Sequence, residues 1–353
     1  MFLAWQEMKR EKTRYGLIVL MLFLISYLIF MLAGLSYGLA ERNTVAIESW
    51  QTQSVVLNEN ANVSLNQSLL TKTDLQHTKL SKKEALVGQL PVVVKHKKRQ
   101  TLSAQLVGLK KGQFIYQDMP IVKGRKAKTQ HELVADSYLE QKGYHLGDRV
   151  TLNGSQDKYK LVGFTDHAEI NIAPIVFAKL PVWHALKMAA PNVAGSGIIS
   201  QRKHFKLKQT TETKSYPVQA FINKLPGYRD QNMTFQLMIG FLFVISMIIV
   251  AVFLYIITMQ KMRHFAVLRV QGIPTKTLVG ATLTQSLLLV VLGVALGLLG
   301  MLLTAHLLPA AVPMQLTPQL IWAGSFGMLV MGLLGSLLPV RIISRIDPLQ
   351  ALS

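Results

Sequence analysis

The chain has no cysteine, so no disulfide bond can stabilise any part of it. Charge is also scarce: Asp, Glu, Lys and Arg together make up only 16% of the residues, whereas hydrophobic residues make up 50%. The sequence also lacks a phosphate-binding loop of the form Gly-x-x-x-x-Gly-Lys-Ser/Thr. These absences exclude a disulfide-rich secreted scaffold, and they predict that the chain does not hydrolyse ATP by itself.

Acidic and basic residues are absent altogether from four long apolar runs. A membrane-spanning helix needs roughly 20 predominantly apolar residues, and each run is about that long. The runs predict transmembrane helices over residues 15–40, 234–258, 278–308 and 320–340. The first run is too long for the core of a secretory signal and lacks a cleavage site of small residues, so we expect it to remain as a signal anchor.

Basic residues in the short segments predict the orientation of these helices. Residues 1–14, 259–277 and 341–353 contain ten of the 38 Lys and Arg residues, whereas residues 309–319 contain no charge. Short segments rich in Lys and Arg stay on the cytoplasmic side of a membrane. We therefore predict a multi-pass protein of the plasma membrane, with cytoplasmic N- and C-termini, an amphipathic N-terminal helix, an uncharged outer loop and a large outer domain over residues 41–233.

The predicted outer domain is strongly basic, with 28 basic and 15 acidic residues. Such a charge attracts anionic lipid headgroups, wall polymers or anionic substrates. We expect no nucleic acid partner, because clusters such as Lys95–Arg99 and Lys123–Lys128 lack the interleaved aromatic residues that stack on bases. Membrane lipids are the partners that this surface favours.

The residue pattern of the outer domain predicts an α+β fold. From residue 132 to residue 163 the pattern is that of strand, short helix, Gly147-Asp148 turn, strand, Asn153-Gly154 hairpin turn and strand. Further strands are predicted over residues 90–95, 102–109 and 113–117, and a mixture of helix and loop over residues 51–80. The expected fold class is an α-helical membrane protein with four transmembrane helices and an α+β extracytoplasmic domain between helices 1 and 2.

The segment between the second and third predicted helices has a distinctive sequence. It reads Lys261-Met-Arg-His-Phe-Ala-Val-Leu-Arg269-Val-Gln-Gly272-Ile-Pro274-Thr-Lys276, which predicts a short, basic, amphipathic helix ended by Gly272 and a proline turn. One interpretation is an interfacial helix that only fixes the topology. The segment also resembles the cytoplasmic coupling element of the FtsX/MacB family of ABC transporter permeases, whose form is a charged start followed by apolar-Leu-Arg-apolar-x-Gly. The C-terminal Arg345-Ile-Asp347-Pro348-Leu-Gln-Ala-Leu352 is similar to the closing Asp-Pro-x-x-Ala-Leu of that family.

The resemblance implies partners and a mechanism. Permeases of this family form homodimers and work with a separate cytoplasmic ATPase subunit, which binds the ATP, so the chain is expected to be a non-catalytic permease subunit. The resemblance assigns coupling to the ATPase to Phe265, Leu268, Arg269, Gly272, Asp347 and Pro348. The small residues Gly293, Gly297 and Gly300 permit close helix approach within one chain or between two chains, or packing without a specific partner.

Other residues resemble one branch of the family. The opening residues 1–18, the segment Ala33–Asn43, and residues 162–166 and 171–174 are similar to the HrtB branch, the permeases of haem-efflux pumps in Gram-positive bacteria. This resemblance implies haem as the transported ligand, no cofactor of the chain's own, and a Gram-positive source.

Haem chemistry suggests where such a ligand would bind. Haem iron accepts Tyr, His or Met, and its propionates favour Arg or Lys. Side chains of these types gather in the sequence at the outer ends of the first and second predicted helices, with one histidine in a loop of the outer domain. The candidate haem-binding residues are Met31, Tyr37, Glu41, Arg42, His167, Tyr228 and Met233. Each also has a simpler interpretation, because Tyr at an interface is usually an aromatic-belt residue, Arg there contacts headgroups, and a lone loop histidine is solvated.

Several functions fit this architecture. The resemblance implies export of haem from the outer leaflet by mechanical coupling to the ATPase. Helices without Asp, Glu, Lys or Arg favour this over ion-coupled transport, with His306 near the outer end of the third helix as the nearest exception. A MacB-like exporter of a peptide, antibiotic or lipoprotein is an alternative, as is an FtsX-like regulator of an extracellular cell-wall hydrolase. A membrane enzyme is disfavoured, because no Ser-His-Asp, paired-carboxylate or metal-binding pattern is present. The dispersed histidines predict no metal site.

Overall fold

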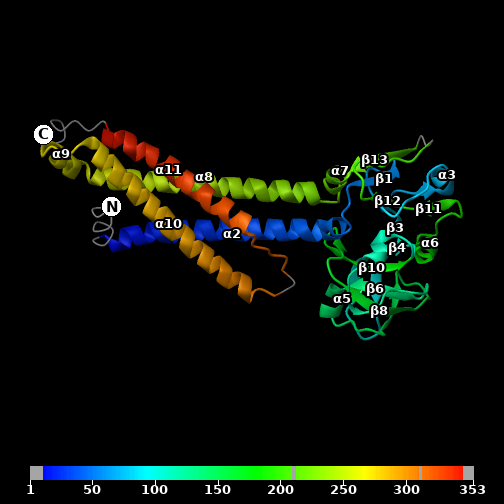
Figure 1. Ribbon diagram of the computed structural model, residues 1–353. Coiled ribbons are helices and arrows are strands. Elements are labelled where there is room, and N and C mark those ends of the chain that lie inside the picture. Colours follow the sequence, from blue (N-terminus) through cyan, green and yellow to red (C-terminus); the bar gives the residue numbers. More distant parts are fainter. Residues whose placement is uncertain (1–10, 209–211, 310–311, 345–353) are drawn as a thin grey trace. The chain divides into compact units, whose positions relative to one another are not determined.

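The computed structural model describes residues 11–208, 212–309 and 312–344, and the chain divides into two compact units. One, the helical unit, consists of Met1–Gly38 and Gln231–Ser353, and the other, the sheet unit, of Leu39–Asp230. The structure confirms the four predicted membrane helices, since four described helices are long and apolar enough to cross a membrane (Figure 1). They are α2 (Lys12–Ser49), α8 (Tyr228–Gln260), α10 (Thr275–Leu307) and α11 (Pro318–Ser344).

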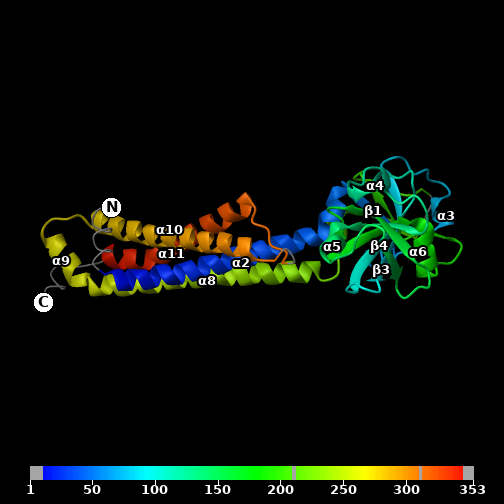
Figure 2. The same ribbon diagram turned by 90° about the horizontal axis from the view of Figure 1, so that it is seen from below.

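The core of the helical unit forms where these four helices pack together. Figure 2 shows α10 and α11 alongside α2 and α8, and the buried side chains between them include Leu22, Leu254, Leu289 and Met328. Two small residues of α10 allow a close approach to α2. A Cβ atom added at Gly293 would lie 2.5 Å from Cβ of Leu22, and one at Gly297 would meet the side chain of Ser26. The sequence left open whether these glycines allow close helix packing within one chain, between two chains or without a specific partner. Gly293 and Gly297 pack against α2 of the same chain.

Strands of the sheet unit pair around a closed ring. The order is β3, β4, β10, β6, β8 and β7, and β7 returns to pair with β3. The pairs β4–β10 and β6–β8 are parallel and the others are antiparallel. Closure leaves these strands without free edges, which would otherwise pair with other chains. The bounds are β3 (Glu84–Lys95), β4 (Leu102–Leu109), β10 (Ala173–Lys179), β6 (Glu132–Asp136), β8 (Tyr159–Thr165) and β7 (Arg149–Leu152).

Alternating residues of the ring strands fill its interior. Because side chains of a strand point alternately to its two faces, residues two apart share one face. The interior core takes such a pair from every ring strand: Val92 and Val94, Ala104 and Leu106, Val176 and Ala178, Leu133 and Ala135, Tyr159 and Leu161, and Val150 and Leu152. The intervening residues, such as Val107, Val134 and Phe177, belong to a second apolar cluster on the opposite face. This cluster also takes in Ile47 and Trp50 at the end of α2 and Phe221 of α7 (Val218–Ile222).

The remaining strands extend the sheet beside the ring. β12 (Gly197–Ser200) pairs with β3, β1 (Ser54–Asn58) with β12, and β13 (Thr213–Pro217) with β1. β5 (Ile121–Gly124) pairs with β8 and β9 (Glu169–Ile170) with β10, while β2 (Leu70–Thr71) and β11 (Val193–Gly195) form a separate pair. The short helices of this unit are α3 (Lys72–Leu75), α4 (Phe114–Gln117), α5 (Ser137–Gln141) and α6 (Leu180–Lys187).

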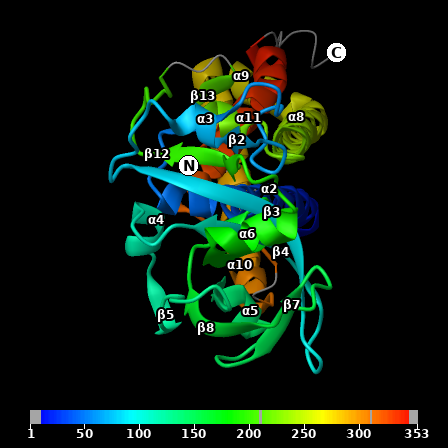
Figure 3. The same ribbon diagram turned by 90° about the vertical axis from the view of Figure 1, so that its right-hand side faces the viewer.

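Helix α6 packs over the ring through one large side chain. Figure 3 shows α6 in front of β3 and β4. Trp183 is fully buried there, and its Nε1–H donates to the carbonyl oxygen of Gln89 at 3.0 Å. A Cβ atom at Gly108 would lie 2.8 Å from Cβ of Trp183, and one at Gly88 would meet the indole ring. Glycine at these positions therefore makes room for the tryptophan, which fixes α6 on the ring.

The structure confirms most of the predicted outer-domain elements and corrects two. Residues 132–163 form the predicted strand, helix, strand and strand, with positive φ at Gly147, Asn153 and Gly154 in the turns. Residues 113–117, predicted as a strand, contain the short helix α4, which buries the consecutive residues Phe114 and Ile115. Residues 51–80, predicted as helix and loop, contain the strands β1 and β2 as well. β1 was not predicted as a strand because it lacks alternating apolar and polar residues: Val55, Val56 and Leu57 are all buried between neighbouring strands.

Candidate coupling and ligand sites

The predicted coupling segment forms the short helix α9 (Met262–Val270) between α8 and α10. The helix ends as the sequence predicts: Gly272 has φ +90°, a conformation that favours glycine, and Pro274 is the N-cap residue of α10. The other two residues assigned to coupling, Asp347 and Pro348, lie outside the described residues.

The residues of α9 differ in their surroundings. Ala266 is fully buried, and Phe265 and Leu268 pack with it against Leu278 of α10 and Ile343 of α11. In contrast, Val267 and Val270 are exposed, Val270 to 62%. Thus Phe265 and Leu268, which the sequence assigns to ATPase coupling, attach α9 to its own unit. The apolar side chains open to a partner are those of Val267 and Val270, which the sequence reasoning did not single out.

A buried tyrosine joins α9 to α2 and α10. Tyr15 of α2 is 2% exposed, and its hydroxyl oxygen accepts a hydrogen bond from Nζ of Lys261, at 3.1 Å, and another from Nε2 of Gln285. Lys261 is the N-cap residue of α9, and its ammonium group also lies 5.7 Å from the centroid of the Tyr15 ring. One phenol therefore connects α2, the α8–α9 junction and α10. Gln285, a lone amide within an apolar run, is the signal in the sequence that could have pointed to this joint.

Toward its other end, the helical-unit part of α2 contacts the loop between α10 and α11. The backbone N–H of Gln315 donates to the carbonyl oxygen of Gly34 at 3.2 Å. A Cβ atom added at Gly38 would lie 2.6 Å from the carbonyl carbon of Pro313. The loop can follow α2 this closely only because both contact positions on the helix lack a side chain.

The candidate haem residues of the helical unit differ in their surroundings. Met31 packs against the apolar core between the helices. Tyr37 and Met233 are exposed, to 43% and 49% respectively, on α2 and α8. Met31 and Tyr37 are therefore not presented together, because one side chain packs inward and the other is open.

In the sheet unit, Arg42 is already engaged. Its Nε and Nη2 atoms donate to the two carboxylate oxygens of Glu169, each at 2.7 Å, and its guanidinium lies 5.2 Å from the centroid of the Tyr138 ring. The backbone N–H of Asn171 donates to the carbonyl oxygen of Asn43 at 3.1 Å, which holds the same loop against α2. The structure thus brings Arg42 to the loop that carries His167. Sequence reasoning missed Glu169, and nothing in the sequence pairs it with Arg42.

Two further candidates of the sheet unit lie near the ends of its helical segments. One carboxylate oxygen of Glu41 is buried and has no hydrogen-bond partner among the residues that the structure describes. Such groups are rare in folded proteins and call for a ligand, a water molecule or a proton. Tyr228, at the start of α8, packs partly buried against the apolar cluster that includes Phe221 and Leu225. Of the two, Glu41 is the group with unmet bonding capacity.

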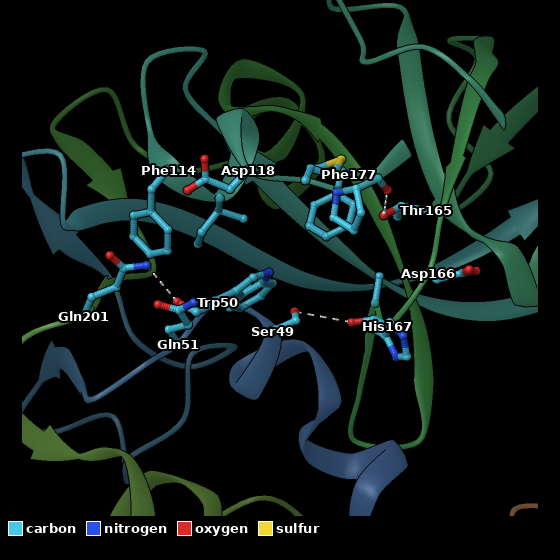
Figure 4. A pocket seen from close by; sticks show the side chains of 14 residues that line it. Ser49, Trp50, Gln51, Phe114, Asp118, Thr165, Asp166, His167, Phe177 and Gln201 are labelled. Carbon is cyan, nitrogen blue, oxygen red and sulfur yellow. Dashed lines mark hydrogen bonds between the residues drawn. The ribbon is translucent and has the colours of Figure 1, made fainter. Parts of the chain in front are cut away.

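His167 lies at the edge of a hollow of about 420 Å³. Figure 4 shows the rings of Trp50, Phe114 and Phe177 around this hollow. Asp118 and Asp166 also line it, and within the described chain no Lys or Arg does. His167 itself adopts a φ of 56°, and its carbonyl oxygen accepts from the hydroxyl of Ser49 at 3.5 Å. The hollow suits an apolar or cationic group better than the carboxylates of a propionate.

A buried carboxylate positions the loop of His167 and Glu169. Asp136 is 5% exposed, and its two oxygens accept from the backbone N–H groups of Tyr138 at 2.8 Å and Ala168 at 3.0 Å. Burial raises the pKa of Asp136 to about 6, despite these hydrogen bonds. On the exposed side of the ring, the guanidinium of Arg125 beside Glu132 lowers the pKa of that carboxyl to about 2. The sheet unit therefore contains two carboxyl groups whose pKa values are shifted in opposite directions.

Comparisons with known proteins give matches over the C-terminal helices and over the whole chain. Residues 237–348 match the family model of the FtsX-like permease C-terminal region. The chain is 26% identical to a putative hemin transport system permease protein HrtB of Staphylococcus haemolyticus, over 100% of this chain and 99% of that protein. It is 24% identical to the protein of the same description from Staphylococcus epidermidis, with the same coverage.

Two solved structures are similar to part of the chain. The extracellular domain of the noncanonic ABC-type transporter YknZ from Gram-positive bacteria aligns with 43% of this chain and 84% of that structure, at 12% identity and a TM-score of 0.33. The periplasmic region of MacB from Actinobacillus actinomycetemcomitans aligns with 48% of this chain and 89% of that structure, at 10% identity and a TM-score of 0.35.

Proposed function

We propose that this chain, a member of the FtsX-like ABC transporter permeases, is the membrane subunit of a pump that exports haem. ATP is bound and hydrolysed on a separate cytoplasmic ATPase subunit, and the chain itself carries out no catalysis and holds no cofactor. Haem enters from the outer leaflet of the membrane and is expelled by a mechanical movement of the permease. The pump contains two copies of the chain.

The observation that carries the mechanical part of this proposal is the joint at Tyr15. A push on α9 reaches Lys261 at its N-cap, and the hydrogen bond from Lys261 passes the displacement to Tyr15 of α2. Helix α2 runs without interruption from Lys12 to Ser49, so residues of both units belong to this one helix. A movement of α9 is therefore delivered to a helix that continues into the sheet unit.

The exposed residues of α9 are the proposed contact with the ATPase. Val267 and Val270 offer exposed apolar surface, and Arg263 and His264 are exposed beside them. Phe265 and Leu268 transmit the force by holding α9 on α10 and α11, and the turn at Gly272 fixes where α10 begins. In this arrangement the N- and C-terminal ends and α9 lie in the cytoplasm of a Gram-positive bacterium, and membrane lipids surround the helices.

The identity of the substrate is supported by the relatives, which are described as hemin transport permeases and are aligned over their whole length. On the helical unit, the exposed Tyr37 is the proposed iron ligand and the exposed Met233 is a further sulfur contact. Met31 packs inward, so it takes part only if the helix core opens. On the sheet unit, Arg42 is the proposed propionate ligand, in exchange for Glu169. Glu41, Tyr228 and His167 are further candidate haem contacts of that unit. A haem propionate can form the same bidentate pair with the guanidinium of Arg42 that Glu169 forms.

The experiment that tests this function measures ATP hydrolysis by the chain reconstituted with its cognate ATPase in liposomes, with and without haemin. Haemin should stimulate hydrolysis saturably. Tyr37→Ala, Arg42→Ala and Tyr228→Ala should each weaken the apparent haemin affinity without loss of membrane insertion. Stimulation by a peptide, antibiotic or lipoprotein but not by haemin would contradict the proposal and favour a MacB-like exporter. Binding of the chain to an extracellular cell-wall hydrolase, with no substrate effect, would favour an FtsX-like regulator instead.

A further inference from the structure

A second cavity of the sheet unit combines an apolar floor with a basic rim. It measures about 770 Å³, within the range of roughly 300–1,000 Å³ that is usual for ligand sites. The buried residues Leu109, Leu180, Val193 and Ala194 form its floor. Five lysines line it, namely Lys72, Lys110, Lys111, Lys128 and Lys179. This cavity, called the lysine cleft here, shares no lining residue with the hollow beside His167.

The lysines of the cleft are brought together from separate elements. Lys110 and Lys111 directly follow β4, Lys128 precedes β6, and Lys179 ends β10 and is the N-cap residue of α6. Lys72 begins α3, which a capping box between Thr71 and Asp74 fixes in place. The convergence is therefore a product of the fold, since no run of the sequence contains all five.

The five lysines give the cleft an excess of positive charge, although Glu132 acts on Lys179 from outside its lining. In the described part of the chain, none of the five ammonium groups forms an ion pair with a carboxylate, and no acidic residue lines the cleft. Lys179 is partly buried, with its Nζ atom 4.4 Å from the centroid of the Tyr116 ring, and burial together with the neighbouring Lys111 lowers its pKa. An anion in the cleft would relieve this repulsion, and the apolar floor favours an anion with an apolar body.

A histidine completes the set of ligand-binding groups. His184 of α6 also lines the cleft, and its ring lies 4.9 Å from that of Trp183 in an edge-to-face arrangement. Trp183 is fixed on the ring of strands by its burial and its hydrogen bond to Gln89. An imidazole held in this way over an apolar floor can bind haem iron, while lysines bind the propionates.

We infer that the lysine cleft is a second haem-binding site, with His184 as iron ligand and Lys111 and Lys179 among the groups that bind the propionates. The identity of the ligand rests on the proposed function, whereas the preference for an anionic, largely apolar molecule rests on the cleft itself. A site of this kind on the sheet unit would hold haem outside the membrane helices.

Two other hollows of the sheet unit lack one of the required features. The hollow beside His167 has an apolar wall but carries Asp118 and Asp166 and no described Lys or Arg. A third hollow, lined by residues 76–79, 202–206 and Lys208, is basic and contains His77 and His204. Phe205 is the one large apolar residue among its described lining, so it offers no apolar floor for a porphyrin. The third hollow therefore supplies a matched control, since it has the same charge and ligand type as the cleft.

The test is a haemin titration of the full chain in detergent, followed by the Soret band. The wild type should show two saturable phases. His184→Ala should remove the band shift of one phase, and Lys111→Gln with Lys179→Gln should weaken the affinity of that phase by about tenfold or more, as for lost charge-assisted hydrogen bonds. His204→Ala should leave both phases unchanged, and Tyr37→Ala should affect the other phase only. Unchanged thermal unfolding midpoints in all variants verify that they fold.

The outcomes separate this inference from the proposed function. If His184→Ala and the double lysine variant leave every phase as in the wild type, while Tyr37→Ala abolishes binding, the cleft is not a haem site and the exporter proposal stands. If the wild type shows no saturable haemin binding, both the assignment of the lysine cleft and the proposed haem export are wrong. If vesicles of dioleoyl phosphatidate displace haemin equally from the wild type and from His184→Ala, the cleft is a general site for anionic lipid, which overturns the assignment to haem.

Discussion

At the residue scale, the hydroxyl of Tyr15 is the group on which the proposed coupling depends. It accepts hydrogen bonds from two buried or partly buried donors on other helices, Lys261 and Gln285. Donors in a low-dielectric interior are costly to leave without acceptors. A side chain that differs from tyrosine only by this oxygen therefore tests the joint with little change in packing.

We predict that Tyr15→Phe lowers the free energy of unfolding by about 1 kcal/mol and reduces haemin-stimulated ATP hydrolysis, because the hydrogen bonds from Gln285 and Lys261 to the Tyr15 hydroxyl are lost and the joint between α9 and α2 is weakened. Thermal unfolding and ATPase assays of the reconstituted complex measure the two effects. Tyr27→Phe is the matched control, since Tyr27 also belongs to α2 and its hydroxyl lies 3.0 Å from that of Thr304 of α10, away from the joint. Equal stimulated activity in the two variants would contradict the role of Tyr15.

A second residue-scale prediction concerns pH. The pKa of Asp136 is about 6 in the folded protein, against an ordinary value of 3.8 for a solvated aspartate side chain. The folded state thus binds this proton more tightly, so the contribution of Asp136 to stability should be greatest below about pH 4, decrease as the pH rises to about 6, and then stay constant. The contribution of this group is at most about 3 kcal/mol. Glu132, with a pKa of about 2, has the opposite effect, because its stabilisation is lost as the pH falls from about 4.5 to 2.

Asp136→Asn should remove the decrease in stability between about pH 4 and pH 6, although it also loses one of the hydrogen bonds from Tyr138 and Ala168. The measurement is the unfolding midpoint of the full chain in detergent across this pH range, for the wild type, Asp136→Asn and the exposed control Asp157→Asn. A wild-type curve that runs parallel to that of Asp136→Asn would show that Asp136 is not the source of the pH dependence.

The residues of the candidate sites show what a sequence can and cannot reveal at this scale. Tyr37 and Met233 were predicted from residue type and nearness to helix ends, and both are exposed. The pairing of Arg42 with Glu169 could not be predicted, because it depends on a loop that folds back onto α2. The same holds for the lysine cleft, whose charges come from distant segments. Residue types that can bind a ligand are recognisable in a sequence, whereas the side chains that they contact depend on the tertiary structure.

At the element scale, the loop after α10 depends on the missing side chain at Gly38. We predict that Gly38→Val lowers the free energy of unfolding by about 1–3 kcal/mol, the usual cost of overpacking, because the new atoms collide with the backbone of Pro313. Gly240→Val on α8 is the control, since a Cβ atom there has no neighbour within 4 Å. Unfolding midpoints in detergent measure the difference, and similar midpoints for the two variants would show that the loop moves away without cost.

Substitutions in helix α9 should separate binding of the ATPase subunit from transmission of force to the rest of the chain. We expect Val270→Asp to weaken binding of the ATPase subunit without changing the unfolding midpoint, because the side chain is exposed. Leu268→Ala should leave binding intact but reduce stimulated ATP hydrolysis, because it loosens α9 from α10 and α11. Co-purification and activity assays distinguish the two effects. If Leu268→Ala abolishes co-purification and Val270→Asp does not, the proposed roles of the two residues are reversed.

The accuracy of the sequence predictions for elements follows from local signals. The membrane helices and the strands from residue 132 to residue 163 were legible because apolar length, alternation and turn residues are properties of contiguous sequence. The strand predicted over residues 113–117 was wrong, because a single turn of helix buries adjacent residues much as a short strand can. The closure of the ring by β7 was not predictable, since β7 pairs with its hairpin neighbour β8 and also with β3, which is distant in sequence.

At the scale of the whole molecule, the proposed function requires an ATPase-driven movement of α9, a continuous α2 and a ligand that is both apolar and anionic. Haem is such a ligand, and the full-length similarity to hemin transport permeases supports it. The two proposed haem sites differ in their ligands, Tyr37 in one and His184 in the other. Their separate spectral signatures allow each to be followed during turnover.

The measurement that tests the central claim most directly is ATP-driven haem transfer in liposomes that contain the chain and its cognate ATPase. Haemin is supplied in the membrane, apomyoglobin is trapped inside, and ATP is added outside, so that pumps with an external ATPase deliver haem inward. We predict that ATP accelerates the appearance of the myoglobin Soret band in the wild type, and that Tyr15→Phe largely removes this acceleration. The same rate of transfer with and without ATP, in a complex that still hydrolyses ATP, would contradict haem export by this permease.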